Sequence, residues 1–118
     1  MPDEGPVLKA SDFESYAEGQ VIFKEGEPGD RMYYIVAGEV NVLVRGKLVD
    51  VVKTGGILGE IALIDDKPRS ATAMAKTACR LIPINRKRFA AMVQETPNFA
   101  LQVMRTMADR LRQMNVQP

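Results

Sequence analysis

The chain has 118 residues, of which 46% are hydrophobic and 26% charged, and these values are ordinary for a soluble globular protein. This length suits one domain with a single core, and the composition argues against disordered, collagen-like and coiled-coil classes. The formal net charge of +1 predicts no general attraction to nucleic acid. No apolar run approaches the roughly 20 residues of a membrane span, and the N-terminus lacks the basic and apolar regions of a signal peptide. We therefore expect a cytoplasmic protein with no membrane segment.

The sequence contains no histidine and a single cysteine, Cys79. Because histidine is the commonest metal ligand and the usual general base, its absence disfavours a metal site and acid–base catalysis. An enzyme built on Glu60, Asp65 and Asp66 is the remaining catalytic alternative, but adjacent carboxylates in a turn point in different directions. We expect no catalytic residues, no metal and no cofactor. Cys79 is expected to be a small buried apolar residue.

The first half of the chain predicts short strands. Residues 1–12 contain two prolines and scattered charges without periodicity, and we interpret them as a loose leader. β-favouring residues then recur in short runs separated by glycine-containing turns. The predicted strands lie near residues 13–16, 21–23, 32–36, 39–44 and 48–52. Short strands with turns about every eight to twelve residues predict an antiparallel sandwich or barrel.

The second half predicts two more strands, near residues 71–75 and 78–84, and then two helices. Asn85 can cap the first helix, at about 86–95, and Pro97 can open the second, at about 97–115. Apolar residues at helical spacing form one stripe on the second helix, at positions 100, 103, 104, 107, 108, 111 and 114. The predicted domain thus covers residues 13–118, with a barrel at about 13–84.

Between these halves, the stretch from Gly59 to Thr72 combines several features that suit an anion. A glycine allows a close approach of backbone to ligand, and the short helix predicted after it offers unpaired N–H groups at its start. A polar turn then brings back Arg69, whose guanidinium can fork onto phosphate oxygens. Glu60 can accept a hydrogen bond from a sugar hydroxyl. This pattern predicts a site for one phosphate attached to a sugar.

The same stretch resembles the phosphate-binding cassette of cyclic-nucleotide-binding domains, because spacing and residue types agree over its fourteen positions. A second resemblance lies in the turn at residues 23–30 and in the segment from Met32 to Gly38, which in the family are structural. Leu58 and Gly56 depart from the family pattern, which has an aromatic and an acidic residue there. The resemblance implies a mainly β fold: an antiparallel β-roll or jelly-roll barrel with a short cassette helix and two C-terminal helices.

The resemblance also implies a non-catalytic sensor for a cyclic nucleotide, and it assigns roles to individual residues. Glu60 is expected to accept from the ribose 2′-hydroxyl, and Arg69 to pair with the cyclic phosphate. The remaining cassette residues, which contribute backbone N–H groups or a hydroxyl, are Gly59, Ile61, Ala62, Ser70 and Ala71. The residues expected around the purine and in its lid are Val42, Val49, Arg110, Leu111 and Met114. Ser70 in place of threonine favours cAMP over cGMP.

The resemblance further implies that the last helix folds over the base and relays binding by its movement. An alternative is a degenerate domain that serves in dimerisation or interaction, with the apolar stripe of the last helix as the interface. A homodimer through this helix is compatible with either function. The effector, whether a further domain or a separate protein, is not identified by the sequence.

Overall fold

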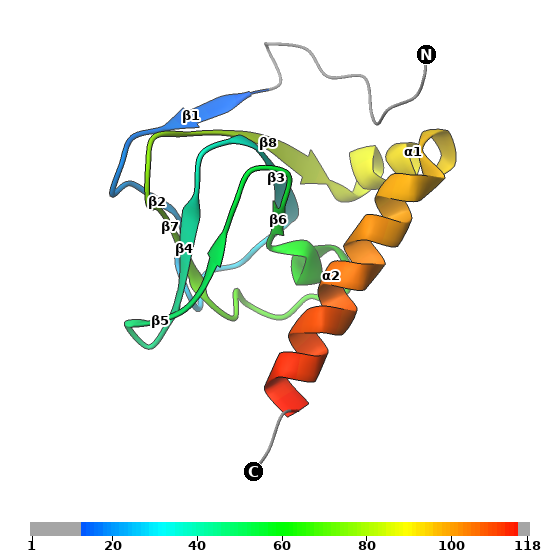
Figure 1. The fold of residues 1–118 in the computed structure, drawn as a ribbon. Helices are drawn as coiled ribbons and strands as arrows, with labels where there is room; N and C mark the ends of the chain where they lie inside the picture. Colours follow the sequence, from blue (N-terminus) through cyan, green and yellow to red (C-terminus); the bar gives the residue numbers. More distant parts are fainter. Residues whose placement is uncertain (1–12, 116–118) are drawn as a thin grey trace.

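The computed structural model describes residues 13–115, without the side chains of residues 111 and 113–115. In this part of the chain, eight strands form two sheets that face one another, and two helices follow them (Figure 1). The strands are β1 (Glu14–Tyr16), β2 (Val21–Phe23), β3 (Arg31–Ala37), β4 (Val40–Val44), β5 (Lys47–Val52), β6 (Ile57–Leu58), β7 (Thr72–Ala75) and β8 (Cys79–Asn85). The helices are the short η2 (Glu60–Leu63), then α1 (Arg86–Glu95) and α2 (Pro97–Asn115).

Both sheets are four-stranded and antiparallel, with the orders β1-β8-β3-β6 and β2-β7-β4-β5. Most neighbours within a sheet are therefore distant in sequence, and the first strand lies beside the last. The predicted fold class, a β-roll with C-terminal helices, is confirmed. Strand β6 was not predicted, because two residues are too few to show any periodicity.

Two apolar clusters stabilise this arrangement. One fills the interior between the sheets and includes Ile35, Leu81 and, as the sequence predicts, Cys79. The other lies between the helices and the outer face of the β3–β8 sheet, and includes Ile82 and Val103. Strand β8 contributes to both clusters because successive side chains of a strand point to opposite faces. Because both faces of β8 are buried, its sequence is a nearly continuous run of apolar residues.

The helices begin as the sequence predicts. The Asn85 side chain accepts a hydrogen bond from the Arg88 N–H at 2.8 Å and thereby caps α1. On α2, Val103 is buried and Met107 half-buried, whereas Met104 in the predicted stripe is 55% exposed. None of the described helices has both the length and the apolar character needed to cross a bilayer.

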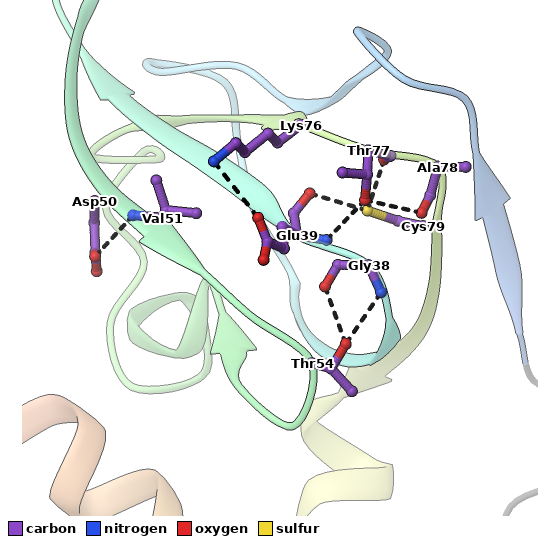
Figure 2. Close-up of polar contacts among 9 residues, drawn as sticks. All are labelled: Gly38, Glu39, Asp50, Val51, Thr54, Lys76, Thr77, Ala78 and Cys79. Atoms are coloured by element: carbon purple, nitrogen blue, oxygen red, sulfur yellow. Dashed lines mark hydrogen bonds and ion pairs between the residues drawn. The ribbon is translucent and has the colours of Figure 1, made fainter.

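Side-chain contacts join the three turns that follow β3, β5 and β7 (Figure 2). The Thr54 hydroxyl accepts from the Gly38 N–H at 3.1 Å and lies 3.2 Å from the Gly38 carbonyl. The Glu39 N–H donates to the Thr77 hydroxyl at 3.1 Å, and the Glu39 carboxylate pairs with Lys76 at 3.5 Å. These contacts fix one edge of the barrel where strand pairing has ended.

Candidate functional site

The cassette begins with a sharp change of direction at Gly59, which has the left-handed φ of 70° that glycine adopts without strain. Helix η2 follows at once as a single turn of 3-10 helix, tighter than the α-helical turns that the sequence suggests. In the turn after it, the Asp65 carboxylate accepts from the Lys67 N–H at 3.0 Å. The chain then returns to η2, so that an Arg69 nitrogen lies 3.4 Å from the Gly59 carbonyl oxygen.

The Arg69 guanidinium is buried, with only 8% of the residue exposed. Its carbon lies 4.0 Å from the centre of the Phe23 ring, a cation–π contact, and Nη2 donates to the Arg31 carbonyl at 2.9 Å. The Nε atom is buried and has no hydrogen-bond partner among the described residues. Burial lowers the pKa of Arg69 below its usual value, although arginine stays charged at neutral pH. A buried cation with an unused donor is a favourable position for an anion.

The turn at residues 25–30, for which the family resemblance implies a structural role, forms the wall of this position. The Arg69 N–H donates to the Glu27 carbonyl at 2.8 Å, and the Gly26 N–H donates back to the Arg69 carbonyl at 2.8 Å. A Cβ atom at Gly29 would lie 2.5 Å from Arg69 Nε, so only glycine leaves room for the side chain. The cluster of glycines in this turn was visible in the sequence, but its connection to Arg69 was not.

Glu60 is buried, with 1% of the residue exposed, and its carboxylate is paired with Arg110 of α2. Nη1 of Arg110 contacts both carboxylate oxygens, while Nη2 donates to the Ile57 carbonyl at 3.0 Å. Arg110 was predicted above the purine, and the structure places it against the residue predicted to hold the ribose. This pair is the polar link between the cassette and the last helix.

The other predicted cassette residues surround η2 and Arg69 with different exposures. Ile61 is 44% exposed, Ser70 is exposed and Ala71 is half-buried. The Ala62 N–H donates to the Gly59 carbonyl at 3.1 Å, so a phosphate contact from Ala62 requires this bond to be shared or broken. The structure therefore brings the cassette residues together around Arg69, and their individual roles stay predictions.

The residues predicted on the purine side are less closely grouped. Val42 is half-buried and packs against the interior cluster. Val49 is 57% exposed, like its neighbour Leu48, because both lie at the exposed hairpin end of β5. Val49 is the extra residue of a bulge, where pairing shifts from Val42–Asp50 to Leu43–Leu48. The side chains of Leu111 and Met114 lie outside the described residues.

A hollow of about 270 Å³ lies between the edge of β5 and α2. Arg110 lines it together with Asp50, Thr106 and Asp109. Since Arg110 also contacts Glu60, the hollow adjoins the cassette on the side where α2 crosses it. Asp50 was not singled out in the sequence, because its position beside Val42 depends on the bulge in β5.

The family profile of the cyclic nucleotide-binding domain matches residues 13–96. The chain therefore belongs to the cyclic nucleotide-binding domain family. Among the residues that the structure describes, there is no group of three or more potential metal-binding side chains.

Three similar proteins illustrate this membership. A CRP-like cAMP-activated global transcriptional regulator of Mycobacterium tuberculosis is 30% identical, over 85% of this chain and 47% of its own length. A cAMP-dependent protein kinase regulatory subunit of Emericella nidulans is 34% identical, over 81% of this chain and 24% of its own. The crystal structure of the Thermus thermophilus catabolite activator protein superposes with a TM-score of 0.76 at 28% identity, covering 89% of this chain and 53% of that one. The chain thus spans about half or less of the length of these relatives.

Proposed function

We propose that this domain is a non-catalytic sensor that binds cAMP in preference to cGMP. Arg69 pairs with the cyclic phosphate, and Glu60 accepts from the ribose 2′-hydroxyl. Backbone N–H groups of the cassette and the Ser70 hydroxyl complete the contacts to the phosphate or base. The purine occupies the side facing α2, where the hollow beside Arg110 offers space.

One observation carries this proposal: the buried Arg69 guanidinium has an Nε donor without a partner among the described residues. Leaving such a donor unpaired is costly, and an anionic oxygen would remove that cost. A cyclic phosphate carries a single negative charge, which matches one guanidinium. The proximity of Glu60 supports a sugar attached to the phosphate, since a carboxylate accepts from a hydroxyl but repels an anion.

The preference for cAMP is supported by the names of the relatives, two of which refer to cAMP. In the site itself, the exposed Ser70 has a small, freely rotating hydroxyl, so base discrimination by the cassette should be modest.

We also propose that α2 relays binding, because its Arg110 shares Glu60 with the incoming ribose. We also propose a location in the cytoplasm.

A calorimetric titration of the chain tests the proposal, with cAMP, cGMP and 5′-AMP as ligands. We expect one nucleotide per chain, with cAMP bound most tightly and 5′-AMP weakly, because its open phosphate has a different charge and shape. 2′-Deoxy-cAMP should bind less well than cAMP, and Glu60→Gln should reduce that difference. Equal binding of cAMP and 5′-AMP, or no binding of either cyclic nucleotide, would contradict the proposed site.

We also propose that the chain forms a homodimer through α2. The alternative function, a degenerate domain that serves only in dimerisation or interaction, would use the same helix. Leu101 and Met104 are 44% and 55% exposed and lie three residues apart, so they share one face of the helix. Sedimentation of the parent and of Met104→Glu tests this idea. We expect a dimer that the charged variant dissociates; a parent that sediments as a monomer at high concentration would oppose it.

A further inference from the structure

Arg86 connects the start of α1 to the far end of the cassette helix. Its Nε donates to the Leu63 carbonyl at 3.2 Å, and its Nη2 lies 3.4 Å from the carbonyl oxygens of Ala62 and Asp65. The same nitrogen pairs with the Asp66 carboxylate at 3.2 Å. One guanidinium thus reaches three carbonyls and a carboxylate at the C-terminal end of η2.

These carbonyls need donors from outside the helix. The last carbonyls of any helix lack partners within it, and cations near a helix C-terminus are favourable. Helix η2 has no basic residue in its own last turn. The N–H groups of Ile64 and Asp65 both bond to the Ile61 carbonyl, at 2.9 and 3.2 Å, so they do not serve the carbonyls that follow. Arg86 supplies the missing donors from another element.

The stability of α1 does not explain why position 86 is an arginine. Arg86, Lys87 and Arg88 place three cations in the first turn of α1, where the helix dipole favours negative charge. Replacing a cation there by alanine should slightly stabilise an isolated helix. The contact with η2 therefore accounts better for Arg86 than the stability of α1 does.

We propose that Arg86 is a positioning residue that holds the cassette helix in its binding position and couples that position to α1 and α2. This inference rests on the proposed function. Helix η2 has four residues and is about 8 Å long, so a shift at its Arg86 end also moves Glu60 at the other end. The coupling continues into α2 through the edge-to-face contact of Phe89 with Phe99, whose ring centres are 6.1 Å apart.

Lys87→Ala is the matched control for Arg86→Ala, because each variant removes one cation from the first turn of α1. Lys87 is exposed, and in the described part of the chain its side chain forms no hydrogen bond or ion pair with η2. Arg86→Ala should weaken cAMP binding roughly three- to tenfold, since the Arg86 side chain is 57% exposed and solvent screens its bonds. Lys87→Ala should stay within about twofold of the parent.

Two further variants separate the contributions of the contact. Arg86→Lys should fall between parent and Arg86→Ala, because an ammonium cannot reproduce the planar fork of donors. Asp66→Asn should bind almost as the parent does, because the Asp66 side chain is 94% exposed and such a pair contributes little. A large loss in Asp66→Asn would assign the effect to the ion pair and not to the carbonyls.

Amide hydrogen exchange supplies a measurement that a simple loss of stability would not reproduce. Without nucleotide, Arg86→Ala should speed exchange at residues 61–66 relative to Lys87→Ala, while the urea midpoints of the two variants stay similar. At saturating cAMP, the protection that the ligand confers on α1 and α2 should be smaller in Arg86→Ala.

The outcomes distinguish this inference from the proposed function. Equal affinity and equal exchange in Arg86→Ala and Lys87→Ala would overturn the role of Arg86. If the parent does not bind cAMP, the proposed function fails, and exchange at residues 61–66 without ligand still tests whether Arg86 holds η2. Unchanged exchange there would contradict the holding role, whatever the ligand.

Discussion

Arg69 and Arg110 both reach the start of η2, but their surroundings differ. Arg69 is enclosed by the barrel, lies over Phe23 and forms no ion pair with any described residue, and its Nε is unused. Arg110 comes from α2, keeps 30% of its side chain exposed and is already neutralised by Glu60. An incoming anion therefore gains the most binding free energy at Arg69, which has a free donor and no ion pair with a described residue. At Arg110, a ligand has to share an interaction that already exists.

The largest expected effect on cAMP affinity comes from replacing Arg69, whose Nε donor has no partner among the described residues. Arg69→Ala should weaken cAMP binding by about three powers of ten, because two charge-assisted bonds of about 2 kcal/mol each are lost. Arg69→Lys should also bind worse, since a point charge cannot form the fork. Calorimetric titration measures both.

Arg80→Ala is a matched control for this experiment, because Arg80 also lies over an aromatic ring, Phe13, at 5.4 Å. Arg80 is exposed on β8, and its replacement should leave cAMP affinity unchanged. A similar loss in both variants would mean that general positive charge, and not the Arg69 position, attracts the nucleotide.

Replacing Arg110, which is paired with Glu60, should lower the free energy of unfolding. Arg110→Met leaves the Glu60 carboxylate buried without its partner and should lower the free energy of unfolding by about 2 kcal/mol, discounted for the partial exposure of Arg110. Urea unfolding measures the loss. The double variant Glu60→Gln with Arg110→Met should recover part of it, because no buried charge then remains. Strictly additive losses would show that the two residues do not interact.

A smaller effect is expected from crowding Arg69 without removing it. Gly29→Ala places a Cβ atom 2.5 Å from Arg69 Nε, and the backbone of Gly29 does not itself require glycine. The guanidinium must move, which should weaken cAMP binding about tenfold and lower stability by about 1 kcal/mol. In an Arg69→Ala background the stability cost should disappear. If it persists there, the clash is not with Arg69.

The smallest predicted effect is on Tyr33, which stacks on Phe23 at 6.0 Å. Burial raises the pKa of Tyr33 above 10.0, the charge of Glu14 raises it further, and Arg31 and Arg69 oppose the rise. The resulting stabilisation is fully present below the unfolded pKa of about 10 and is lost as the pH rises through the folded pKa. Arg69→Ala should raise the pKa of Tyr33 further, as measured by tyrosinate absorbance and assigned with Tyr33→Phe. An unchanged titration would place Arg69 farther from this ring.

The features that the sequence predicted are encoded within continuous stretches. Antiparallel strands, the Asn85 cap and both helices follow from local patterns, and the cassette from Gly59 to Thr72 is a single segment. The surroundings of Arg69 could not be inferred in this way, because Phe23, Gly29 and the Arg31 carbonyl reach it only through the fold.

Other details escaped prediction for similar physical reasons. The unpaired position of Val49 depends on a one-residue bulge, which periodicity does not reveal. The exposure of Met104 depends on which part of an apolar stripe meets the barrel. The bonds of Arg86 to η2 join residues more than 20 positions apart, so no local pattern could indicate them.

The contacts around Arg69 also determine when the anion position forms during folding. Arg69 is 38 positions from Arg31, and its backbone bonds to Glu27 and Gly26 are longer in range still. Arg69 and the residues around it lie in different halves of the chain, so neither half alone can form the anion position, and contacts that close such long loops form slowly. A nucleotide that binds only the complete fold would then draw the last unfolded molecules into it by mass action. Recovery of binding after two separately produced halves are mixed would therefore report directly on assembly of the barrel.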